Sequence, residues 1–196
     1  MVLFGFTVAK ARENIESGRK NTTIRSFSEG RCKSILTHGM HFYEHPRTRN
    51  VRFIAYFPAD TIDTITFADM SDEELEKTAY NDGFDSVEEM REFFEQQYED
   101  YETKQFQIVR WSPDRGVFEN DLAGITSEGL KKYLKSQGWV EKSPEKYRLG
   151  EVMVRVKSAT ASEKLQTLRK ISERSGRGIR EVTDGVLALE DTEASA

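Results

Sequence analysis

The stretch at residues 112–124, SPDRGVFENDLAG, constrains the fold of this chain most, because it divides 196 residues into two parts of different character. Pro113 removes a backbone donor, and Gly116 and Gly124 favour turns, so no continuous helix or strand is expected there. A chain of this length can hold one domain and a smaller unit. The expected parts are a domain at residues 1–112, a linker at 113–125, a module at 126–189 and a flexible tail at 190–196.

The first part alternates short apolar runs with segments of helical character. The runs are rich in β-branched and aromatic residues, which favour strands. Ser71 and Ser86 each precede acidic residues, a pattern typical of helix N-termini. In the second of these helices, the apolar residues expected to form the buried face recur at helical spacing: Val87, Met90, Phe93, Phe94 and Tyr98. Strands are expected at residues 3–9, 40–45, 49–59, 61–70 and 104–111, an extended segment at 21–27, and helices at 10–17, 72–80 and 87–101. This order predicts an α+β domain with a curled, barrel-like sheet and inserted helices.

The second part has a different order of elements. Thr126 is a helix N-cap and Gly138 ends that helix. Residues 139–156 alternate in polarity, with Gly150 near the turn of an expected hairpin. Residues 162–176 are amphipathic, and 178–189 can form a short final helix. The sequence therefore predicts a small α/β module built as helix, hairpin and helix.

Composition is ordinary for a globular protein, with 37% hydrophobic and 32% charged residues and a mean hydropathy of −0.67. No apolar run reaches the length of a membrane span, and the N-terminus lacks the pattern of a secretory leader. We therefore expect a cytoplasmic protein without a membrane partner. Cys32 is the single cysteine, so neither an internal disulfide nor a cysteine-based zinc site is expected, and no cofactor is implied.

Charge is distributed unevenly along the chain. Residues 10–52 carry ten Lys/Arg against four Asp/Glu, whereas residues 60–103 carry two against sixteen. A basic segment inside an acidic protein can bind an anion locally even though the overall charge is −5. The acidic helices within 71–101 are either a solvated face or an interface for a basic protein partner.

The basic segment contains GRKNTTIR at residues 18–25, which has three interpretations. Lys20 and Arg25 can contact a phosphate while Thr22 or Thr23 donates to another oxygen. Arg25 can instead be an internal ion-pair partner of the acidic helices. The third interpretation is catalytic: a desolvated lysine with cationic neighbours can lose its proton near neutrality and act as general base for a threonine nucleophile.

Gly18, Lys20, Thr23 and Arg25 fit the G-x-K-x-x-T-x-R signature of ASCH domains, members of the PUA-like superfamily, so the chain resembles that family. Further segments follow in the family's order, at residues 38–49, 71–94 and 107–111, and the resemblance covers roughly residues 2–112. The chain departs from it at Met40, where many members carry an aspartate. The C-terminal module lies outside the match and is left unassigned.

The resemblance implies a PUA-like small β-barrel with a cleft that binds RNA, a nucleotide or a modified nucleobase. For some small bacterial members it also implies hydrolysis of N4-acetylcytidine by a lysine, a threonine and an acid, which here correspond to Lys20, Thr23 and Asp82. The usual acid is a glutamate, and an aspartate is one methylene shorter. The implied binding residues are Gly18, Arg19, Thr22, Arg25, Arg47 and Thr48.

The leading expectation is therefore recognition of RNA, a nucleotide or a modified nucleobase. The first alternative is an amidohydrolase acting on N4-acetylcytidine or a related acylated base, and the second is a protein-interaction module that uses the acidic helices at 71–101. Three histidines, His38, His41 and His45, have spacings that would suit a metal on a helix. Their side chains diverge on the expected strand, so no metal site is predicted.

Overall fold

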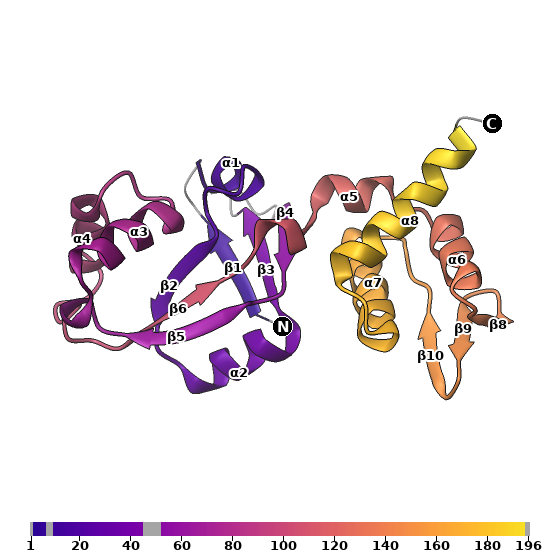
Figure 1. Cartoon of the computed structure of the whole chain (residues 1–196), viewed down its shortest axis with the longest axis horizontal. Coiled ribbons are helices and arrows are strands. Elements are labelled where there is room, and N and C mark those ends of the chain that lie inside the picture. The colour runs from indigo at the N-terminus through magenta and orange to yellow at the C-terminus, as the bar shows by residue number, and fades with distance from the viewer. Residues whose placement is uncertain (1, 7–9, 45–51, 195–196) are drawn as a thin grey trace. The chain divides into compact units, whose positions relative to one another are not determined.

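The computed structural model describes residues 2–6, 10–44 and 52–194 (Figure 1). The chain divides into two compact units, Met1–Pro113 and Asp114–Ala196. Both units combine helices with short strands, so the expected α+β class is confirmed. No helix in the described ranges has both the length and the apolar character needed to cross a bilayer.

The first unit contains six of the ten strands that the structure describes. Its elements are β1 (Val2–Phe6), α1 (Lys10–Glu16), β2 (Thr22–Ser26), α2 (Glu29–His38), β3 (Met40–Glu44), β4 (Arg52–Phe57), β5 (Thr61–Ile65), η1 (Phe67–Asp69), α3 (Asp72–Asp82), α4 (Val87–Glu95) and β6 (Phe106–Arg110).

The strands of this unit form two open sheets. In one, β3 lies between β1, to which it is parallel, and β4, to which it is antiparallel. In the other, β6 lies between β2 and β5 and is antiparallel to both. The closed barrel expected from the sequence is wrong for the described strands, because β2, β6 and β5 pair among themselves instead of joining β1 and β3 into one ring.

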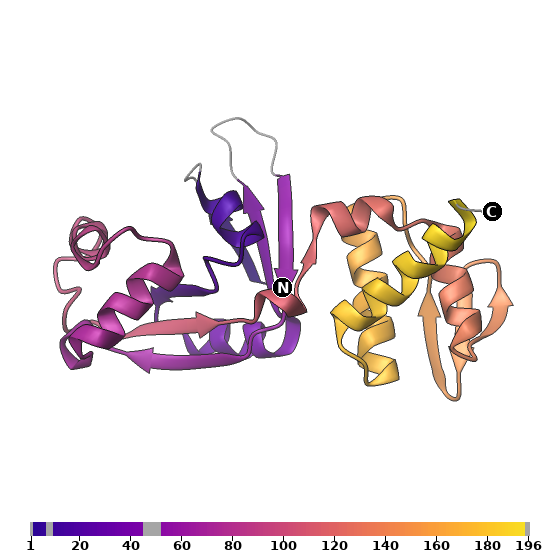
Figure 2. The same ribbon diagram turned by 45° about the horizontal axis from the view of Figure 1, so that its top comes forward.

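One face of the β2–β6–β5 sheet packs against α3 and α4 (Figure 1, Figure 2). Ser71 forms a capping box with Glu74 at the start of α3, and the side chain of Ser86 accepts a hydrogen bond from the backbone N–H of Glu89 in α4. The buried apolar side chains of this core are Ile24, Phe67, Leu75, Ala79, Met90, Phe94, Phe106 and Ile108. Helix α4 ends at Glu95, earlier than the expected residue 101, and Phe93 of the expected buried face is 43% exposed.

The opposite face of the same sheet lies toward an aromatic group from the other sheet. The Phe42 ring centroid is 4.9 Å from that of Trp111, and the Phe57 centroid is 5.6 Å from it. Phe4 stacks on Phe42 at 5.5 Å. The β2–β6–β5 sheet is therefore covered on both faces.

Helix α2 was not predicted from the sequence. Its N-cap is Ser28, whose side chain accepts from the Arg31 N–H, and it ends at Gly39. Gly39 has a φ of +68°, and a Cβ there would lie 2.5 Å from the hydroxyl oxygen of Tyr56, so only glycine fits. The helix buries little of its surface, with Ile35 as its one fully buried residue, and this explains why apolar periodicity did not reveal it.

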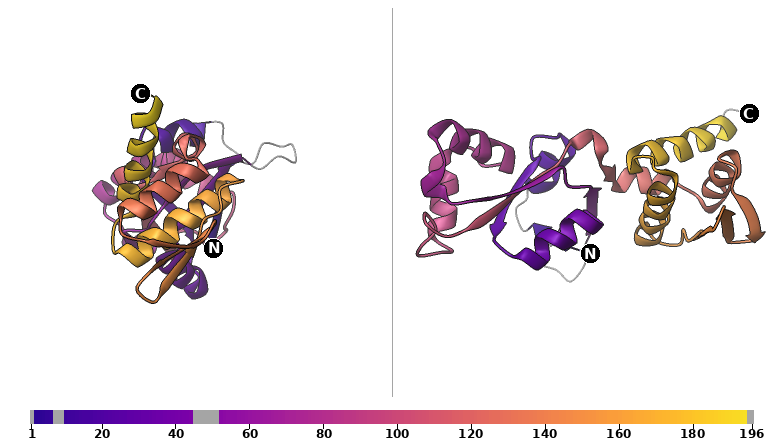
Figure 3. Two further views of the ribbon diagram at one scale, coloured as in Figure 1. Left: turned by 90° about the vertical axis from the view of Figure 1, so that its right-hand side faces the viewer. Right: turned by 60° about the horizontal axis from the view of Figure 1, so that its bottom comes forward.

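The second unit differs from the expected helix–hairpin–helix order in three ways. Residues expected to form a linker include α5 (Glu119–Gly124), which packs against α7 (Ala161–Ser175) and α8 (Ile179–Ala194). A third strand extends the hairpin into an antiparallel sheet of order β10-β9-β8, at Val152–Arg155, Lys146–Leu149 and Val140–Ser143 (Figure 3). Helix α8 continues through most of the expected tail. The elements are η2 (Pro113–Arg115), β7 (Val117–Phe118), α5 (Glu119–Gly124), α6 (Ser127–Ser136), β8 (Val140–Ser143), β9 (Lys146–Leu149), β10 (Val152–Arg155), α7 (Ala161–Ser175) and α8 (Ile179–Ala194).

Candidate functional site

A tight turn after α1 positions Lys20. Gly18 has a φ of +76°, in the region that favours glycine. The chain then folds back, so that the Lys20 backbone N–H donates to the Asn14 carbonyl oxygen at 2.7 Å. This turn directs the lysine side chain into the unit, where the residue is 4% exposed. Gly18 thus acts through backbone shape, as the motif requires.

Lys20 forms a buried ion pair with Asp82, although 62 residues separate them. The lysine ammonium donates to Asp82 Oδ1 and to the Asp82 backbone carbonyl oxygen, and the two side chains are 5% and 6% exposed. The second carboxylate oxygen, Oδ2, accepts from the Ile24 backbone N–H at 3.1 Å. Asp82 is the last residue of α3, so one carboxylate joins the end of α3 to both Lys20 and β2.

Burial controls the electrostatics of this cluster. Removal from water lowers the pKa of the Lys20 ammonium, the nearby Arg25 lowers it further, and the Asp82 carboxylate opposes the shift. Burial also lowers the pKa of the Arg25 guanidinium, again opposed by Asp82. The site therefore holds two cations near one anion in a desolvated environment, which favours an anionic or hydrogen-bond-accepting ligand.

Alternation along β2 separates its side chains between the two faces of the sheet. Ile24 belongs to the core against α3 and α4, so Thr23 and Arg25 point to the opposite face. The Arg25 guanidinium lies 5.3 Å from the centroid of the Phe4 ring and donates to the Ile24 carbonyl oxygen at 2.7 Å. We call this side of β2 and β6 the Thr23 face.

Thr23 is fully buried, and its hydroxyl oxygen has no hydrogen-bond partner among the described residues. Lys20 is therefore not hydrogen-bonded to Thr23 in this structure. The structure forms only part of the catalytic arrangement expected from the sequence. Lys20 and Asp82 form an ion pair, but Thr23, the expected nucleophile, is not hydrogen-bonded to Lys20, the expected base.

Two residues of the Thr23 face were missed by sequence reasoning. Gln107 pairs with Arg25 across the strands, and its Oε1 accepts from Cys32 Sγ at 2.8 Å and from the Ser28 backbone N–H at 3.3 Å. Its Nε2 is buried without a partner in the described part of the chain, as is Nε1 of Trp111. Gln107 is a single polar residue in an apolar strand, and this local pattern does not predict a buried amide with an unpaired donor.

Arg19 and Thr22 do not join this group. The Arg19 guanidinium donates to the Phe84 carbonyl oxygen at 3.1 Å and to Asp85 Oδ1 at 2.9 Å, and this hydrogen bond raises the pKa of Arg19. Thr22 is buried on the α3 side of β2, where its hydroxyl donates to Asn21 Oδ1 at 3.3 Å. Arg19 thus holds the α3–α4 loop, and Thr22 belongs to the core side.

The remaining residues singled out in the sequence are two predicted binding residues and three histidines. Arg47, Thr48 and His45 lie outside the described residues. His38 ends α2, whereas His41 is buried in β3 with its ring centroid 5.1 Å from that of Tyr56. In the ranges that the structure describes, no group of three His, Cys, Asp or Glu residues could hold a metal ion.

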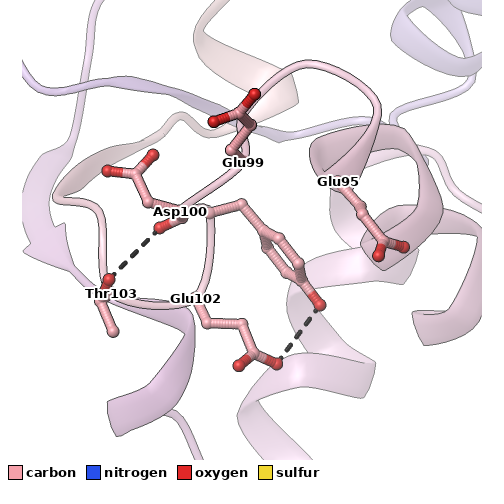
Figure 4. Close-up of a pocket in the computed structure, with 6 residues that line it drawn as sticks. Glu95, Glu99, Asp100, Glu102 and Thr103 are labelled. Atoms are coloured by element: carbon pink, nitrogen blue, oxygen red, sulfur yellow. Dashed lines mark hydrogen bonds between the residues drawn. The ribbon is translucent and has the colours of Figure 1, made fainter.

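A separate pocket of about 430 Å³ lies in the loop between α4 and β6 (Figure 4). Tyr101 donates to Glu102 Oε1 at 3.4 Å, and the Thr103 hydroxyl donates to the Asp100 carbonyl oxygen at 3.4 Å. The lining residues are Glu95, Glu99, Asp100, Tyr101, Glu102 and Thr103. The pocket is lined mainly by acidic residues. Binding of a basic protein partner by the acidic helices stays a prediction.

Comparisons with protein-family models, with curated proteins and with solved structures found no match to this chain.

Proposed function

We propose that the first unit is an ASCH-type, PUA-like domain that binds RNA, a nucleotide or a modified nucleobase on the Thr23 face. One observation carries the proposal: Thr23 Oγ1 and Gln107 Nε2 are both buried, lie on the same face and have no partner among the described residues. The G-x-K-x-x-T-x-R resemblance supplies the class of ligand.

Energetics favour a ligand for these groups. A buried polar group without a hydrogen bond lowers the stability of the fold by about 1–3 kcal/mol. Two such groups on one face are therefore destabilising unless they gain hydrogen-bond partners. Gln107 can offer a ligand only the N–H donors of Nε2, because its acceptor Oε1 is already used by Cys32 Sγ and the Ser28 N–H. A ligand that fits must present acceptors, as the carbonyl and ring-nitrogen edges of nucleobases do.

Lys20 and Asp82 hold in place the strand that carries this face. Their ion pair fixes the start of β2 against the end of α3, and Asp82 also holds the Ile24 N–H within β2. The strand that carries Thr23 and Arg25 is thereby kept in one position before any ligand arrives, which reduces the entropic cost of binding. In this proposal the pair positions the binding residues.

The test is a titration followed by two-dimensional NMR of the ¹⁵N-labelled protein. The probes are cytidine, N4-acetylcytidine, cytidine 5′-monophosphate and a short RNA oligonucleotide. We expect at least one probe to shift the Gln107 side-chain NH₂ signals and the backbone signals of Thr23 and Arg25. Shifts confined to other parts of the unit, or no saturable shift with any of the four probes, would overturn the proposal.

A second candidate is hydrolysis of N4-acetylcytidine, and the burial that lowers the pKa of Lys20 favours it. A neutral lysine could accept the Thr23 proton if ligand binding released it from Asp82. The threonine oxygen would then attack the acetyl carbon, the lysine would pass its proton to N4 as cytidine leaves, and water would release acetate from the threonine. Mass-detected chromatography tests this candidate. Conversion by wild type that is lost in both Lys20→Ala and Thr23→Val supports it, and no conversion at high enzyme concentration contradicts it.

A further inference from the structure

The three-stranded sheet of the second unit has one buried and one open face. Tyr147 and Val154 are neighbours across β9 and β10, and they are 0% and 1% exposed. The residues that alternate with them are all exposed. Register therefore assigns six side chains to the open face: Val140, Ser143, Lys146, Arg148, Met153 and Arg155.

An apolar and cationic row crosses this open face. Val140 pairs with Arg148, and Arg148 pairs with Met153, so Arg148 lies in the central strand between two apolar neighbours. Val140 is 56% exposed and Met153 is 58% exposed, high values for apolar residues of a sheet. Such a row can contact a flat, partly apolar partner.

The charges of this face are predominantly positive. Arg155 is paired with Glu145 at 3.0 Å. Lys146 and Arg148 have no ion pair in the described part of the chain, and the same holds for Lys142, which is exposed in the bulge of β8 beside the face. Arg148 Nε donates to the Gly150 carbonyl oxygen at 2.5 Å, which restrains the side chain on the sheet. Three cations thus remain to attract an anionic partner.

We propose that this open face, which we call the β8–β10 face, binds single-stranded RNA. Lys142 and Lys146 contact phosphates, the Arg148 guanidinium stacks on a base, and Val140 and Met153 pack against the neighbouring base or ribose. Charge complementarity selects a polyanion, and the apolar residues select one whose bases are exposed rather than paired in a duplex. The site lies in the second unit and does not depend on the function proposed for the first.

Fluorescence anisotropy of the full chain with a labelled oligouridylate of about twelve nucleotides tests this site. Wild type is compared with Lys142→Gln/Lys146→Gln/Arg148→Gln and with a control, Lys33→Gln/Lys170→Gln/Arg174→Gln, which removes three exposed cations from α2 and α7. The comparison is made in a Thr23→Val background, in which the Thr23→Val single variant takes the place of wild type, so that the first unit contributes little.

We expect the β8–β10 variant to lose about tenfold or more in affinity at low salt. The slope of log affinity against log salt should fall by about 1.4, because each of the two lost phosphate contacts to a single strand removes about 0.7. The control should change affinity less than threefold. Val140→Ser/Met153→Ser should weaken binding while leaving the salt slope unchanged, and far-ultraviolet circular dichroism checks that each variant folds.

Three outcomes would overturn the proposal. Equal losses in the two triple variants would mean general electrostatic attraction without a site. Preference for a duplex of the same length would exclude the single-strand contacts. A change in sedimentation behaviour without a change in RNA affinity would assign the face to a protein partner, such as the acidic helices of a second copy.

Discussion

The two faces of the β2–β6–β5 sheet are both buried, yet they are built differently. The α3 side holds apolar residues such as Ile24, Phe106 and Ile108 in one cluster. The Thr23 face holds Thr23 and Gln107, each with a buried polar atom that lacks a partner in the described chain. The first face stabilises the unit, whereas the second retains a cost in stability, and such a cost is commonly found at functional sites. Truncation of a residue on the α3 side should therefore lower the free energy of unfolding, whereas removal of a polar group from the Thr23 face should leave it unchanged or raise it.

The largest effect is expected on the α3 side. Phe106→Ala removes a fully buried ring that contacts Phe67, Phe94 and Tyr98, so it should lower the free energy of unfolding by about 3–5 kcal/mol. Urea denaturation followed by circular dichroism measures the change. A loss below about 1 kcal/mol would show that this face is not the main core of the unit.

The ion pair between Lys20 and Asp82, which joins the end of α3 to β2, should come next. Asp82→Ala leaves the buried Lys20 cation without its carboxylate, and we expect a loss of about 3 kcal/mol in the free energy of unfolding. The double variant Lys20→Met/Asp82→Leu should be more stable than Asp82→Ala alone. If Asp82→Ala is as stable as wild type, the proposed anchoring of β2 to α3 is wrong.

The pH dependence of stability should show a smaller effect with a defined sign. The pKa of Lys20 is lowered in the folded state, so between that pKa and the ordinary value of 10.5 the unfolded chain binds more protons than the folded chain. Stability attributable to Lys20 should therefore increase as pH rises through this window. Comparing wild type with Lys20→Met in urea at several alkaline pH values isolates the contribution, and a decrease with pH in that difference would contradict it.

The smallest effect on stability is expected on the Thr23 face. Thr23→Val removes a hydroxyl that has no protein partner and keeps the shape of the side chain, so the free energy of unfolding should stay the same or rise, by at most about 1 kcal/mol. Thermal unfolding in the absence of ligand measures it. A clear loss of stability would reveal that the hydroxyl has a structural role within the unit.

The sequence predicted the α3 side better than the Thr23 face. Ser71 and Ser86 predicted the starts of α3 and α4 through local capping chemistry. The helical spacing of Met90 and Phe94 predicted the buried side of α4. Lys20 and Asp82 were selected by resemblance, and the structure brings them together. Local rules succeed where the determining partners are a few residues away.

The misses have a common physical cause. Gln107 is distinguished only by Cys32 and Ser28, which lie far from it in the chain, so no local pattern could reveal its fixed amide. Helix α2 buries too little to show apolar periodicity. The glycines and proline at 113–124 indicated a linker, but Leu122 of α5 is buried in the second unit, and long-range packing overrode the turn signals.

The most direct test of the ligand-binding role of the Thr23 face compares two valine substitutions on neighbouring residues of β2. Thr23→Val and Thr22→Val are matched in chemistry and burial, but they lie on opposite faces of the sheet. Affinity is measured by NMR titration with the probe that produces the largest shifts in wild type. We expect Thr23→Val to weaken binding about tenfold without loss of stability, while Thr22→Val leaves affinity unchanged. Equal affinities for the two variants, or a loss confined to Thr22→Val, would contradict the assignment of ligand binding to this face.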